Sequence, residues 1–310
     1  MSAAPDTVTL FSPSGVIAQA APLRRAARRL AAHGFEVRLD ESALAKSQRF
    51  AGDDTVRLAA VHRVAAAAPS VALASRGGYG LTRLLGHLDW RALAGAVERG
   101  TRWVGQSDFT ALHLGLLAHV PGALKQGGAW AGPLACADFG RTEEEGGVDD
   151  ITEACFLEAV HGELEAVGFR TADGHEGLEA RGTLWGGKLS MVCSLLGTPH
   201  WPRVKGGMLF LEDVNEHPYR VERCLLQLAQ AGVLGAQKAI LLGGFDGWRA
   251  SPLDRGYGLK AMVAHLRSVV DVPVLTGLPF GHGETKVCLP VGRPVELVVQ
   301  GRDVLLAWGH

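Results

Sequence analysis

The sequence of 310 residues predicts an α/β protein in which a parallel sheet carries helices on both faces. Strand and helix patterns alternate over residues 1–140, and such alternation is typical of βαβ units. The composition becomes acidic and glycine-bearing over residues 141–175, which we expect to be a linker. Residues 176–310 hold more β-type runs and turns, so we predict a second, β-rich α/β domain there.

The elements of the first domain follow from short apolar runs that are separated by Ala-rich stretches. An Ala- and Arg-rich helix stops at Gly34, because glycine commonly ends a helix in a left-handed conformation. A second Ala-rich helix is predicted over residues 54–67. The strands are expected at residues 8–11, 35–39, 71–74 and 103–104.

The rest of the chain is divided in the same way. The stretch ITEACFLEAVHGELEAVG predicts a helix that ends at Gly168. Two more helices are expected near residues 218–232 and 257–269. Strands are expected at residues 182–189, 207–211, 239–242 and 295–299.

Composition excludes several classes of function. The formal net charge is −1 and no Lys/Arg run occurs, so neither a nucleic-acid nor a membrane partner is expected. The five cysteines form no C-x-x-C pair, and the twelve histidines show no metal-ligand spacing, so we expect no metal or other cofactor. The N-terminus has no signal-peptide pattern and no run is long enough to span a membrane. We therefore expect a cytoplasmic protein.

The turn GQSD, residues 105–108, follows a strand and precedes a helix. Taken alone, Ser107 is more easily explained as a helix N-cap than as a nucleophile. In a parallel sheet, however, reactive groups gather beyond the carboxyl ends of the strands, where the loop SRGGYG (75–80) also falls. That loop suits an anion cradle, a backbone donor to an oxyanion or a simple tight turn.

Two further segments carry groups that suit acid–base chemistry. Glu212 and Asp213 follow an apolar run; turn and cap roles suit Asp213 but suit Glu212 less well. His282 has a glycine on each side and is accessible, as a general base must be, although most loop histidines are simply solvated. With Ser107 these residues supply a nucleophile, an acid and a base. The turn is not the G-x-S-x-G elbow of α/β-hydrolases, because Phe109 stands where its last glycine belongs.

Six segments together resemble the LD-carboxypeptidase (muramoyltetrapeptide carboxypeptidase) family of serine peptidases in order and spacing. The resemblance implies a flavodoxin-like, or class I glutamine-amidotransferase-like, first domain, a smaller β-rich second domain and a homodimer. The segments are FSPSG, RGGYGLTRLL, GQSDFTALHLGL, GTLWGGKLSMVCSLLGTP, FLEDVNEHPYRVERCLLQL and GLPFGHGETKVCLPVG.

The resemblance also implies a role for each candidate residue. Ser107 would be the nucleophile, His282 the general base and Glu212 the residue that orients it. The oxyanion hole would use the backbone N–H groups of Gly78 and Asp108. Glu216 is the weaker candidate for the acid, because it lies past the end of the strand.

The implied activity is release of the terminal D-Ala from murein tetrapeptides during peptidoglycan recycling. Three departures from the family pattern, at Gln106, residues 125–128 and Lys188, bear on the preferred substrate. One alternative is an immunity-type peptidase of the same family that cleaves peptidyl or aminoacyl nucleotide antibiotics; Trp130, Trp185 and Trp248 are its candidate platforms for a base. The other is a non-catalytic protein in which RGGYG holds an anion and Ser107 only caps a helix.

Overall fold

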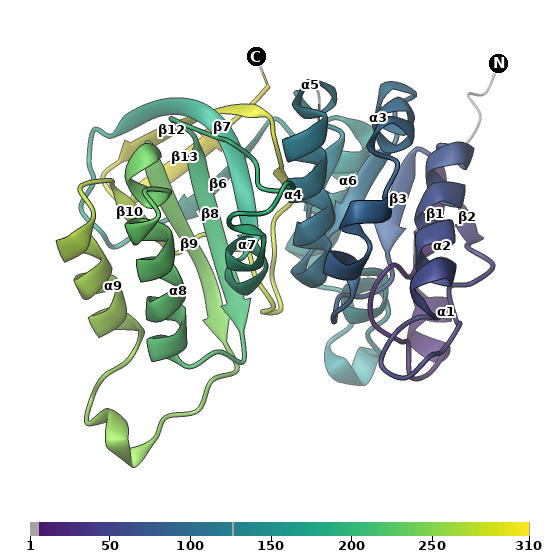
Figure 1. The fold of residues 1–310 in the computed structure, drawn as a ribbon, viewed down its shortest axis with the longest axis horizontal. Helices are drawn as coiled ribbons and strands as arrows, with labels where there is room; N and C mark the ends of the chain where they lie inside the picture. Colours follow the sequence, from purple (N-terminus) through teal and green to yellow (C-terminus); the bar gives the residue numbers. More distant parts are fainter. Residues whose placement is uncertain (1–5, 126, 310) are drawn as a thin grey trace.

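Two β-sheets lie side by side in the computed structural model, which describes residues 6–125 and 127–309 (Figure 1). Residues 1–5, 126 and 310 lie outside the described residues. They include the start of the segment considered for a signal peptide and Gln126 of the 125–128 departure. The N-terminal sheet is mostly parallel and the C-terminal sheet is mixed, which confirms a two-domain α/β protein.

The first sheet has the strand order β2-β1-β3-β4-β5-β11. Strands β1 to β5 are parallel, and β11 adds an antiparallel edge. Every residue of β3 is buried, as expected for a strand with helices on both faces. The strands are β1 (Thr7–Phe11), β2 (Glu36–Leu39), β3 (Val71–Ala74), β4 (Arg102–Gly105), β5 (Ala129–Ala131) and β11 (Leu289–Pro290).

The helices of the first domain differ in how much of their surface is buried. Helix α1 buries one stripe, Leu23, Ala26 and Leu30, at helical spacing. Helix α4 is buried from Thr110 to Leu117, because it packs between α3 and the α7–β7 region of the second domain. The helices are α1 (Ala21–Ala32), α2 (Asp54–Ala67), α3 (Trp90–Glu98), α4 (Thr110–His119), α5 (Pro121–Leu124) and α6 (Asp150–His161).

The second sheet has the order β10-β9-β8-β7-β12-β13-β6. Strands β7 to β10 are parallel, and β12, β13 and β6 continue the sheet in antiparallel fashion. Helix α8 lies in front of the β8–β10 part of the sheet in Figure 1, and α9 packs beside α8 at its outer edge. The elements are β6 (Ala166–Arg170), β7 (Glu179–Lys188), β8 (Met208–Val214), β9 (Ala239–Asp246), β10 (Val274–Thr276), β12 (Pro294–Gln300), β13 (Asp303–Ala307), α7 (Leu189–Leu195), α8 (Pro218–Gln230) and α9 (Leu259–Val269).

The helix predicted to end at Gly168 ends earlier, so this prediction was wrong. Helix α6 stops at His161, where Gly162 adopts a left-handed φ of 80° and ends the helix. Ala166–Arg170 is an edge strand with alternating burial, and it pairs with β13. Residues 141–175, expected to be a linker, therefore include a helix that packs on the first domain and a strand of the second sheet.

Candidate active site

The candidate site lies beyond the carboxyl ends of β1, β3 and β4. The strand order reverses between β1 and β3, and ligands of doubly wound sheets bind in the crevice at such a reversal. The loops after these two strands touch: the Gly15 N–H donates to the Gly77 carbonyl at 3.1 Å. A Cβ on Gly15 would lie 2.7 Å from the same oxygen, so the approach requires glycine.

Ser107 occupies a strained position in the turn between β4 and α4. Its φ is +63°, in the left-handed region that serine rarely adopts. The N-cap of this turn is Gln106 and shows no side-chain cap bond, so Ser107 does not cap the helix as the local pattern suggested. Strain of this kind costs about 1–3 kcal/mol and persists where the surrounding structure imposes it, often at functional sites.

The glycine loop after β3 lies directly against Ser107. A Cβ on Gly77 would lie 2.7 Å from Ser107 Oγ and 3.5 Å from the backbone N of Asp108. Across residues 6–125 and 127–309, no turn or loop hydrogen bond uses the N–H of Gly78 or of Asp108. Among the described residues, the backbone N–H groups of Gly78 and Asp108 therefore remain available as hydrogen-bond donors beside Ser107.

The Asp108 side chain joins three loops of the site. Its Oδ2 accepts hydrogen bonds from Ser14 Oγ at 2.7 Å and from the backbone N of Leu81 at 2.9 Å. Burial raises the pKa of Asp108, and these two hydrogen bonds act in the opposite direction. The carboxyl group therefore ties the β1 loop and the glycine loop to the Ser107 turn.

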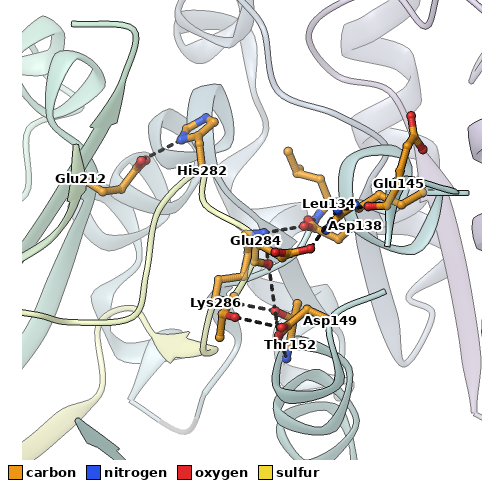
Figure 2. Close-up of polar contacts among 11 residues, drawn as sticks. Leu134, Asp138, Glu145, Asp149, Thr152, Glu212, His282, Glu284 and Lys286 are labelled. Carbon is orange, nitrogen blue, oxygen red and sulfur yellow. Dashed lines mark hydrogen bonds and ion pairs between the residues drawn. The ribbon is translucent and has the colours of Figure 1, made fainter. Parts of the chain in front are cut away.

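Glu212 and His282 form a pair in the second domain (Figure 2). Glu212 lies on β8 with a side chain that is 0% exposed, and its Oε2 is 2.7 Å from His282 Nδ1. This contact directs Nδ1 toward the carboxylate, so Nε2 is the ring nitrogen that stays available for another partner. Glu216 lies beyond the strand end, where it pairs with Arg220 at 3.7 Å on the surface.

His282 belongs to a segment, residues 277–288, that crosses from β10 to the first sheet at β11. Lys286 Nζ pairs with Asp138 Oδ1, and both side chains are nearly buried. Thr285 Oγ1 donates to Asp149 Oδ2 at 2.8 Å, and the Lys286 N–H donates to Thr152 Oγ1 at 2.9 Å (Figure 2). The first domain thus holds the segment that carries His282.

The sequence did not predict the contacts that hold the His282 segment against the first domain, above all the Lys286–Asp138 ion pair. Its signal was present in GHGETK, where a lysine follows His282 by four residues. A lysine in a glycine-rich loop is usually solvated, so the pattern alone gave no reason to bury it.

One cavity is lined by Gln106, His282 and the charged side chains Asp138, Arg141, Glu284 and Lys286. Gln106 directly precedes Ser107, so the cavity adjoins the Ser107 turn and the Glu212–His282 pair. Among the residues that the structure describes, no hydrogen bond joins Ser107 Oγ to the His282 ring. Catalytic hydrogen bonds often tighten only when a substrate is bound.

The other residues singled out from the sequence lie in different surroundings. Trp130 and Trp185 are buried, and their indole N–H groups donate to Gly127 O and Gln237 Oε1, so neither offers an open aromatic face. Trp248 is half-buried. Lys188 Nζ lies 3.4 Å from Asp213 Oδ1, and its backbone N–H donates to Thr110 Oγ1 across the domain boundary.

Two family patterns together cover most of the chain. Residues 8–124 match the LD-carboxypeptidase N-terminal domain, and residues 181–297 match the LD-carboxypeptidase C-terminal domain. The chain belongs to the LD-carboxypeptidase family. This confirms the resemblance drawn from the six sequence segments.

Solved and curated relatives agree with this assignment. This chain is 36% identical to the muramoyltetrapeptide carboxypeptidase from Oxalobacter formigenes, with a TM-score of 0.86 and coverage of 98% of this chain and 99% of that one. It is 29% identical to the murein tetrapeptide carboxypeptidase of Pseudomonas aeruginosa over 294 residues, 94% of this chain and 92% of the relative. The microcin C7 self-immunity protein MccF, solved in complex with aspartyl sulfamoyl adenosine, shares the fold at 20% identity, with a TM-score of 0.84 and coverage of 98% and 96%.

The described residues hold neither a membrane-spanning helix nor a cluster of metal ligands. Within residues 6–125 and 127–309, no helix is long and apolar enough to cross a membrane. Among the same residues, no group of three or more His, Cys, Asp or Glu side chains is placed to hold a metal ion.

Proposed function

We propose that this LD-carboxypeptidase is a serine carboxypeptidase that releases the terminal D-Ala from murein tetrapeptides. The observation that carries the proposal is the 2.7 Å contact between the buried Glu212 and His282, which lines a cavity beside the strained Ser107 turn. The names of the relatives from Oxalobacter formigenes and Pseudomonas aeruginosa support the same substrate class.

The geometry supports acyl transfer through a covalent intermediate. His282 Nε2 removes the proton of Ser107 Oγ, and the oxygen attacks the carbonyl carbon of the terminal peptide bond. The carbonyl oxygen becomes an oxyanion, which the N–H groups of Gly78 and Asp108 stabilise. When the C–N bond breaks, His282 returns its proton to the amine of D-Ala, and the peptide remains esterified to Ser107.

Hydrolysis of the ester repeats the same steps with water. His282 takes a proton from the water, whose oxygen attacks the ester carbonyl, and the proton then returns to Ser107 as the shortened peptide leaves. Glu212 orients the ring and stabilises the imidazolium in both halves. Its complete burial makes this interaction stronger than it would be in water.

The test is to incubate the purified protein with a murein tetrapeptide that ends in meso-diaminopimelate–D-Ala and to measure D-Ala by mass spectrometry. We expect release by the natural protein and none by Ser107→Ala. A parallel incubation with aspartyl sulfamoyl adenosine compares the nucleotide-antibiotic class by relative turnover. Absence of D-Ala release at every pH tried would refute the proposed substrate.

A covalent serine reagent separates an enzyme from a non-catalytic binder on the same scaffold. We expect labelling at Ser107 that disappears in His282→Ala, because the reagent needs an activated hydroxyl. An unreactive Ser107 in the folded natural protein would favour the binder.

A further inference from the structure

We propose that Arg141 binds the free C-terminal carboxylate of the peptide substrate, an inference that rests on the proposed function. A carboxypeptidase must distinguish a free chain end from an internal peptide bond, and a guanidinium is the side chain best shaped to hold a carboxylate. Arg141 lines the same cavity as His282 and Gln106, close to the reacting groups.

Among the described residues, the guanidinium of Arg141 is held in place by hydrogen bonds from only one of its three nitrogens, Nη2. Its Nη2 donates to the carbonyl oxygen of Glu145 and to Glu284 Oε1 at 3.0 Å. In the part of the chain that the structure describes, no hydrogen bond uses its Nε or its Nη1. The side chain is thus oriented by its neighbours while several N–H groups stay available for a ligand.

The carboxylate of Glu284 pairs with the Arg141 guanidinium, and the chain end of the substrate is also a carboxylate. The Glu284 side chain is 63% exposed, and ion pairs at such exposed positions contribute little because water screens them. A substrate carboxylate can therefore displace Glu284, whose side chain can turn into solvent. Lys286 is not equivalent, because its charge is matched by Asp138 in a nearly buried pair.

Gln106 supplies an independent sign that the cavity receives a polar ligand. The residue is 3% exposed and lines the cavity, and its Oε1 is buried with no hydrogen-bond partner among the described residues. A buried polar atom without a partner is unusual in a native protein. A peptide N–H of the bound substrate would satisfy this oxygen while the chain end reaches Arg141.

The experiment measures binding in a Ser107→Ala background, so that substrate is not consumed. Calorimetry compares the tetrapeptide that ends in a free carboxylate with the same peptide ending in an amide. We expect the acid to bind about 10- to 100-fold more tightly than the amide, the range for a hydrogen bond to a charged group. Adding Arg141→Met should bring the ratio near one with amide binding little changed, and Arg141→Lys should keep part of it.

Glu284→Gln provides the matched control, because it removes the charge from the same ion pair. A binding role for Arg141 predicts opposite effects: Arg141→Met weakens acid binding, whereas Glu284→Gln strengthens it by up to about fivefold. A purely structural ion pair predicts that both variants weaken binding of both peptides. That result, or an acid preference that survives Arg141→Met, would overturn the inference. Turnover by the natural protein tests the proposed function separately.

Discussion

Replacing Glu212 by alanine is the most informative change at the candidate site. Its carboxylate is 0% exposed and accepts the His282 Nδ1 hydrogen bond at 2.7 Å, so water does not screen the contact. A hydrogen bond to a charged group contributes about 1.5–3 kcal/mol. In the transition state His282 carries a full positive charge, which increases the loss, and each 1.36 kcal/mol corresponds to about a tenfold change in rate.

Comparable hydrolases indicate the size of the effect. Removing the orienting acid of a serine triad lowers kcat by about 10⁴, whereas removing the nucleophile lowers it by about 10⁶. We therefore expect Glu212→Ala to retain activity about 10²-fold above the Ser107→Ala background. The assay is kcat for D-Ala release, with the fold of each variant checked by thermal melting.

Glu216→Ala is the matched control for this prediction. Glu216 is 35% exposed and pairs with Arg220 at 3.7 Å, and such surface pairs contribute at most about 1 kcal/mol to stability. Its loss should leave kcat close to that of the natural protein. If Glu216→Ala lost most of its activity and Glu212→Ala stayed near the natural rate, the choice of Glu212 would be wrong.

Three other predictions concern the site and its support. Ser107→Ala and His282→Ala should each lower kcat by about 10⁶, and the double variant should be no slower, because the two residues act as one unit; additive losses in the D-Ala assay would contradict this. Lys286→Met should lower the free energy of unfolding in urea by about 3–5 kcal/mol, because it leaves Asp138 buried and unpaired. Asp138→Asn added to that variant should restore much of the loss, and no recovery would argue against a buried ion pair. Burial lowers the pKa of His113 from 6.5 to about 4 in the folded protein. Between these two pH values the unfolded chain therefore binds more protons than the folded chain does. Stability should therefore fall by about 3 kcal/mol as the pH drops through this window. His113→Gln should remove this dependence in denaturation curves measured over a pH series, and an unchanged slope would count against the assignment.

The local elements of the first domain were predictable because their signals lie within a few residues. Helix α2 covers the residues expected for it, 54–67, and β3 covers residues 71–74. Such signals are short-range: apolar periodicity, helix ends and glycine turns act over one or two turns of chain. The same kind of signal is ambiguous near residue 162, because Gly162 and Gly168 can each end the helix by sequence, and in the structure Gly162 ends α6.

The sequence also singled out Ser107, Glu212 and His282 as candidate residues, mostly through the six family segments, and their roles stay a prediction. Each segment alone left the ordinary explanation open, because serines cap helices and loop histidines are commonly solvated. The structure removed one such explanation directly, since the positive φ of Ser107 and the N-cap at Gln106 are incompatible with a capping role.

Sequence by itself determined the class of fold, the family and the types of residue available for chemistry. Tertiary structure decided which of them meet: the Glu212–His282 contact spans 70 positions of the chain, and the Lys286–Asp138 pair that anchors the His282 segment spans 148. It also placed Arg141, in a segment expected to be a linker, at the wall of the cavity. Contacts of this kind depend on strand order and domain packing, which many weak interactions set together, so no short stretch of sequence specifies them.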